Sequence, residues 1–121
     1  MKKIALLFLL NFFCFVSYAD QASIVLRDAS NQHNHSEYYP PADMPEVHFD
    51  SSDMEIIIVA DGFADYYDVE IVSLGSGLTL IGTQVDGYGD SIDVSSLSIG
   101  DYRIVITSSN NNVFEGDFAI E

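Results

Sequence analysis

The stretch LSIGDYRIVIT, residues 97–107, carries the clearest structural signal in the chain. From Tyr102 onward the apolar Ile104 and Ile106 alternate with more polar or exposed positions, which is the pattern of a strand with one buried face. A tyrosine at the start of a penultimate strand, just after a turn, is typical of a tyrosine corner, in which the phenol oxygen binds upstream backbone. We therefore expect Leu97 to plug the core beneath the turn, and Gly100 to adopt a backbone conformation that other residues avoid.

The same period of two recurs on both sides of this stretch. Residues 67–73 and 114–120 alternate apolar with polar side chains, and clusters of Gly, Asn, Asp and Ser separate the segments. Seven such segments fit between residues 46 and 121 at the turn spacing expected of a sandwich. The prediction is all-β: a seven-stranded antiparallel immunoglobulin-like β-sandwich. Within it, the apolar run 56–59 predicts a strand covered on both faces, and Gly82 predicts a β-bulge.

The N-terminal third of the chain has a different composition. Residues 1–19 predict a cleaved signal peptide, with Lys2 and Lys3 ahead of a short apolar run and small residues before Asp20. Residues 20–45 predict one additional strand at 23–27, followed by a long linker that contains all three prolines. We expect export to the periplasm or the extracellular space, with no membrane span in the mature chain, since the apolar run is too short to cross a bilayer.

Charge excludes several classes of function. The 121 residues contain 19 Asp and Glu against 4 Lys and Arg. Loss of the signal peptide would leave Arg27 and Arg103 against all 19 acidic residues, a net charge of −17. Such a chain is not expected to bind nucleic acid, whose phosphates require lysine and arginine. The mature chain would also lack cysteine, so core burial alone must stabilise it.

The segments DVSSLSIGDYRIVIT (93–107) and VFEGDFAIE (113–121) carry a resemblance to a known family. With the signal peptide and the proline-containing segment, they resemble the small secreted Bacteroides-type proteins of unknown function that have an immunoglobulin-like β-sandwich. The Leu-x-x-Gly-x-Tyr pattern also occurs in the C-terminal sorting domains of type nine secretion cargo, which usually end in basic residues. The stand-alone family is the better match, and the resemblance implies no catalytic residues.

Aromatic side chains near loops are the candidate binding residues. They combine apolar area with a hydrogen-bonding tip, which suits stacking on a sugar ring or contact with a protein. The alternative for each pair is that one ring plugs the core while the other covers it. The candidates are Tyr38, Tyr39, Phe63, Tyr66, Tyr67 and Tyr88.

Clustered carboxylates raise the question of a metal. Asp86, Asp90 and Asp93 lie in and after a glycine-rich turn and form a candidate calcium site. The spacing matches no EF-hand, and aspartates also favour turns and soluble surfaces, so a structural role is the alternative. His33 and His35 with Glu37 lack the fixed spacing of a zinc motif and are interpreted as a polar loop. No cofactor is expected apart from this weak calcium site.

The sequence therefore predicts a non-catalytic exported domain that contacts a protein or a glycan through loops or a sheet edge. One alternative is self-assembly, in which residues 23–27 add to a neighbour's sheet. Another is a small hydrolase with paired carboxylates, which is disfavoured because the short loops leave little room for a cleft and no nucleophile motif is present.

Overall fold

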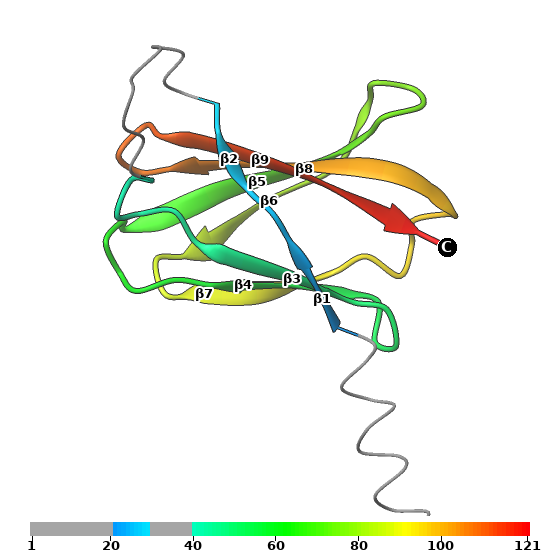
Figure 1. The fold of residues 1–121 in the computed structure, drawn as a ribbon, viewed down its shortest axis with the longest axis horizontal. Coiled ribbons are helices and arrows are strands. Elements are labelled where there is room, and N and C mark those ends of the chain that lie inside the picture. The colour runs from blue at the N-terminus through cyan, green and yellow to red at the C-terminus, as the bar shows by residue number, and fades with distance from the viewer. Residues whose placement is uncertain (1–20, 30–39) are drawn as a thin grey trace, which may run out of the picture.

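The computed structural model describes residues 21–29 and 40–121, and its strands form two packed antiparallel sheets (Figure 1). The strands are β1 (Gln21–Ile24), β2 (Arg27–Asp28), β3 (Glu46–Asp50), β4 (Glu55–Val59), β5 (Tyr66–Ser73), β6 (Thr79–Asp86), β7 (Gly89–Asp93), β8 (Gly100–Ser108) and β9 (Val113–Ile120). No helix that could span a membrane occurs in these ranges. The predicted signal peptide lies outside them.

The predicted seven strands between residues 46 and 121 are confirmed as β3 to β9. The four-stranded sheet has the order β1-β3-β4-β7, and the five-stranded sheet has the order β2-β9-β8-β5-β6. All of the pairings are antiparallel. The architecture is the predicted all-β sandwich, with the N-terminal segment added as two short strands.

The core lies between the sheets and follows the alternation read from the sequence. Along β8, Tyr102, Ile104 and Ile106 are buried, while Arg103 and Val105 are more exposed. Rings from both sheets meet in the core: Phe49 of β3 lies 5.5 Å from Phe118 of β9, centroid to centroid. Because no disulfide is available, this apolar layer must supply the stability of the fold.

The tyrosine corner is confirmed. The Tyr102 hydroxyl donates a hydrogen bond of 2.5 Å to the backbone carbonyl of Ser98, four residues upstream. Leu97 is partly buried and packs against the core, as expected. Gly100 does not have the expected conformation, because its φ is not in the left-handed region and it pairs with Ile120 as the first residue of β8. An added Cβ there would make only ordinary contact with the Tyr102 ring.

The N-terminal strand crosses the edges of both sheets. Residues 21–24 pair with β3, and Arg27 and Asp28 pair with β9. The crossing passes close to Gly116, where a Cβ would lie 2.7 Å from the Val25 carbonyl oxygen. The prediction of a strand at 23–27 is thus refined to two strands with a crossing at Val25 and Leu26. Both pair within the same chain.

Two local predictions are wrong. The run 56–59 is not covered on both faces, because Ile56 and Ile58 are buried whereas Val59 is 46% exposed. The bulge is not at Gly82, which pairs regularly with Glu70. It lies at Leu80, because the partner of Ile71 is Ile81 and the partner of Val72 is Thr79.

Candidate functional site

Loops from both sheets meet at one end of the sandwich, on the left in Figure 1. The β6–β7 turn is bound to the loop after β4 by three backbone hydrogen bonds of 3.1 Å. These run from Ala60 to Tyr88, from Gly62 to Gly87 and from Gly87 to Asp65, nitrogen to oxygen. Gly87 is buried in this contact, and a Cβ would lie 2.0 Å from the Ala64 carbonyl oxygen. These hydrogen bonds therefore fix the positions of the two loops relative to each other.

The β8–β9 loop binds the same region. The Asp65 amide donates to Ser109 Oγ at 2.7 Å, and the Ser109 amide donates to the Tyr66 carbonyl at 3.0 Å. Asn110 Nδ2 donates to the Phe63 carbonyl at 3.1 Å. Three loops far apart in the sequence thus form one connected surface.

Three aromatic side chains project from this surface, and we call them the aromatic rim: Phe63, Tyr66 and Tyr88. Their exposed fractions are 61%, 40% and 73%, so all three rings are open to solvent, Tyr66 less than the other two. The Tyr88 ring lies over Gly62, where a Cβ would be only 2.8 Å from a ring carbon, so it sits beside the residue preceding Phe63. Tyr66 pairs across the strands with Asp86, whose carboxylate accepts from the Tyr88 amide at 2.9 Å. The structure therefore brings these three predicted residues together.

The other predicted aromatic residues have different positions. Tyr67 is 1% exposed, so its predicted role in binding is wrong and it belongs to the core. This outcome follows the alternative in which one ring of a pair plugs the core while its neighbour faces outward. Tyr38 and Tyr39 lie outside the described residues, as do His33, His35 and Glu37.

A buried carboxylate ties the end of the linker to the same loops. Asp43 is 4% exposed. Its side chain accepts from Ser108 Oγ at 2.5 Å and from the side-chain amides of Asn110 and Asn112 at 3.0–3.1 Å. Its backbone carbonyl accepts from the Tyr67 hydroxyl at 2.7 Å. The sequence analysis missed Asp43, because its partners are 24 to 69 residues away and give no local pattern.

These contacts shift the pKa values of the Asp43 carboxyl and the Tyr67 hydroxyl. Burial opposes the charged form of Asp43, but the hydrogen bonds from Ser108, Asn110 and Asn112 outweigh it and hold the carboxyl pKa below its usual value of 3.8. Burial, together with the negative charges of Asp43 and Asp61, raises the pKa of Tyr67. Asp43 therefore remains an anion that accepts hydrogen bonds, and it acts as an anchor for the loops.

The predicted calcium ligands are not gathered into one site. Within residues 21–29 and 40–121, no three His, Cys, Asp or Glu side chains come together in a group able to hold a metal. Asp86, Asp90 and Asp93 each accept a hydrogen bond from a nearby backbone amide, those of Tyr88, Ser91 and Ser95. The bonds from Ser95 lower the pKa of Asp93. This is the turn-stabilising role given as the alternative.

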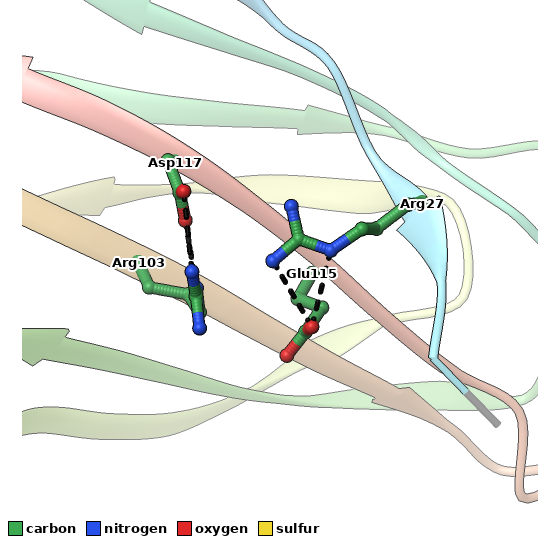
Figure 2. Close-up of polar contacts among 4 residues, drawn as sticks. All are labelled: Arg27, Arg103, Glu115 and Asp117. Carbon is green, nitrogen blue, oxygen red and sulfur yellow. Dashed lines mark hydrogen bonds and ion pairs between the residues drawn. The ribbon is translucent and has the colours of Figure 1, made fainter.

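Both arginines lie on the outer face of the five-stranded sheet (Figure 2). Arg103 of β8 binds the two carboxylate oxygens of Asp117 on β9, at 2.7 and 3.2 Å. Arg27 of β2 binds Glu115 of β9 at 3.1 and 3.2 Å. The hydrogen bond from Arg103 lowers the pKa of Asp117. Since each guanidinium has a carboxylate partner away from the loops, the aromatic rim has no arginine beside it.

An open groove lies on the described surface at the end of β9. It has a volume of about 440 Å³ and is lined by Leu74, Asp101, Asp117, Phe118 and Ala119. A glycosidase needs one carboxylic acid with a raised pKa as proton donor. The pKa of Asp117 is instead lowered, because the hydrogen bond from Arg103 stabilises its charged form. Asp117 is therefore not suited to act as the proton donor that the hydrolase alternative needs.

The two sheets, their order and the tyrosine corner together define an immunoglobulin-like β-sandwich. Among solved structures, the fold is similar to that of a DUF3244 family protein with an immunoglobulin-like β-sandwich from Bacteroides vulgatus. The TM-score is 0.63 at 13% sequence identity, and the match covers 84% of this chain and 99% of that one. A scan of protein-family models and a search of curated proteins give no match. The comparison shows the fold and agrees with the expected resemblance.

Proposed function

We propose that the chain is an exported, non-catalytic domain that binds a protein or a glycan through the aromatic rim. The observation that carries the proposal is the exposure of Phe63, Tyr66 and Tyr88 on loops that hydrogen bonds hold in place. Exposed tyrosine and phenylalanine are enriched at binding surfaces because they bury a large area with few rotatable bonds. Loops that are already ordered lose less entropy when a partner binds.

The negative charge near the aromatic rim restricts the kinds of molecule that could bind there. Asp61, Asp65 and Asp86 lie in the same loops or at their borders, and both arginines are engaged elsewhere. A neutral glycan or a basic protein surface is compatible with this negative electrostatic potential, whereas sulfated or uronic-acid polymers would be repelled. The similarity to an uncharacterised family of the same fold supports a non-catalytic role but identifies no ligand.

The test is binding of the mature chain, residues 20–121, to glycan and protein arrays. We expect hits among neutral glycans or basic proteins. The double variant Phe63→Ala with Tyr88→Ala should weaken them at least about tenfold, because each well-packed aromatic contact contributes 1 kcal/mol or more. The matched control is Val25→Ala with Ile99→Ala, which removes exposed apolar side chains outside the rim. Silent arrays, or equal losses in both variants, would refute the proposal.

A further inference from the structure

A second surface lies along the edge of the five-stranded sheet. Among the described strands, β6 pairs only with β5 and ends the sheet. Its outer backbone N–H and C=O groups are therefore open to another strand. The edge is eight residues long and most of its side chains are exposed. Figure 1 shows the β5–β6 hairpin, in green at the upper right, projecting beyond the body of the sandwich.

The edge of β6 lacks most of the features that usually prevent strand pairing. Such features are short length, proline, charged side chains and β-bulges, and of these β6 has only the bulge at Leu80, near its first residue. The edge strand β7 carries Asp90 and Asp93, while β1 has four residues and β2 has two. Residues 79–85 contain no charge and no proline, although the chain has 19 acidic residues. The longest of these edges is thus also free of charge over seven consecutive positions.

We propose that β6 is a self-association edge at which two copies of this chain pair antiparallel, β6 against β6. A second copy is the favoured occupant because of the charge distribution. Two strongly acidic molecules can approach closely only where no carboxylates oppose each other. Pairing centred on Gly82 meets this condition and places three uncharged pairs opposite each other on either side of the two-fold axis: Thr79 with Val85, Leu80 with Gln84, and Ile81 with Thr83.

Exposed apolar side chains and the open space at Gly82 also favour the pairing of β6 with β6. Leu80 is 47% exposed and Leu78 is 63% exposed, so both have area to bury against a partner strand. At Gly82 the position of a Cβ has no atom within 4 Å, so the sheet face beside the centre of the edge is unobstructed. The joined sheets would contain ten strands, with the two aromatic rims left uncovered.

Sedimentation equilibrium of residues 20–121 tests the proposal. We expect a monomer–dimer equilibrium that shifts toward the dimer between about 20 mM and about 300 mM sodium chloride, because salt screens the repulsion between the two acidic copies. A chain that stays monomeric up to about 1 mM at the higher salt concentration would overturn the proposal.

A pair of variants locates the contact. Thr83→Glu adds a carboxylate to the centre of the edge and should weaken dimerisation about tenfold, since the new charges of the two copies lie diagonally across the interface. Ser96→Glu adds the same charge to the β7–β8 connection and should leave the dimer unchanged. Thermal melting checks that both variants fold. Equal dimerisation of both variants would overturn the proposal and assign association to another surface, including exchange of residues 23–27.

Discussion

Asp43 joins the end of the linker to the loop between β8 and β9. Its carboxylate accepts from three side chains, and its carbonyl accepts from Tyr67. Removing one charged acceptor from a buried network leaves donors without a full partner, which is more costly than the loss of an exposed charge. The position of the loops that carry the aromatic rim therefore depends on one residue outside them.

We predict that Asp43→Asn lowers the free energy of unfolding by about 1–3 kcal/mol at neutral pH. An amide side chain donates at one end and accepts fewer bonds, so it does not match three donors. Thermal or urea denaturation measures the change. The control Asp53→Asn removes the same charge from an exposed position and should have a much smaller effect.

The pH dependence of the difference between wild type and Asp43→Asn follows from the lowered pKa. The folded chain holds the Asp43 proton more weakly than the unfolded chain does, so the stabilisation is fully present above the usual pKa of 3.8. It is lost as the pH falls through the folded pKa, below that value. The difference in stability should therefore be constant above about pH 5 and shrink in stronger acid. A difference that grows on acidification would contradict the assignment.

Single residues also show which contacts the sequence could reveal. The tyrosine corner was predictable because the Tyr102 hydroxyl and the Ser98 carbonyl are four residues apart. The anchor at Asp43 was not, because Asn110 and Asn112 have the ordinary composition of a turn and nothing near them indicates a distant carboxylate. Tyr66 and Tyr67 were both predicted to bind, but only the strand register decides which of the two faces outward.

Close approach between neighbouring strands distinguishes two glycines, Gly89 and Gly82. Gly89 begins β7 with φ +98°, and a Cβ would lie 2.0 Å from the Ile58 carbonyl oxygen on β4. Gly82 lies in β6 with open space around it and no positive φ. The pairing of β4 with β7 requires a glycine at position 89. No contact within the described chain requires a glycine at position 82.

Gly89→Ala should destabilise the fold by at least about 1–3 kcal/mol, the cost of an unfavourable backbone conformation, with the clash against β4 added to it. Gly82→Ala should be neutral or stabilise the strand by up to about 1 kcal/mol, because alanine loses less entropy on folding. Urea denaturation of the two variants measures the contrast. Equal effects would mean that the β4–β7 register is not as described.

Predictions for individual strands succeeded where alternation was clear and failed where it was not. β5, β8 and β9 alternate regularly, and their buried faces agree with the sequence. The run 56–59 is apolar at every position, so composition could not show that Val59 faces outward. The bulge at Leu80 is one extra residue of β6 between the partners of Ile71 and Val72, and no glycine marks that position in the sequence.

Charge acts on the molecule as a whole. A net charge of −15, or −17 without the predicted signal peptide, produces repulsion that the folded state concentrates and the unfolded state relaxes. We predict that the thermal midpoint rises between about 10 mM and about 150 mM sodium chloride, since the screening length falls from about 30 Å to about 8 Å. A midpoint that does not rise would contradict this prediction.

Calcium chloride at the same ionic strength provides the control for specific binding. Because the described carboxylates do not gather into a metal-binding group, calcium and sodium should give similar midpoints. A clearly larger rise with calcium would instead indicate a specific site, as first considered for Asp86, Asp90 and Asp93.

The pairing of both arginines on strands has a consequence for cleavage by proteases. In a chain without the predicted signal peptide, trypsin-like proteases would have only two bonds to cut, those following Arg27 and Arg103. Both arginines lie within paired strands and form ion pairs with carboxylates of β9, Glu115 and Asp117. Paired strands must open locally before a protease can bind and cleave them. Cleavage by trypsin-like proteases at Arg27 and Arg103 is therefore expected to require local unfolding, although no disulfide closes the fold.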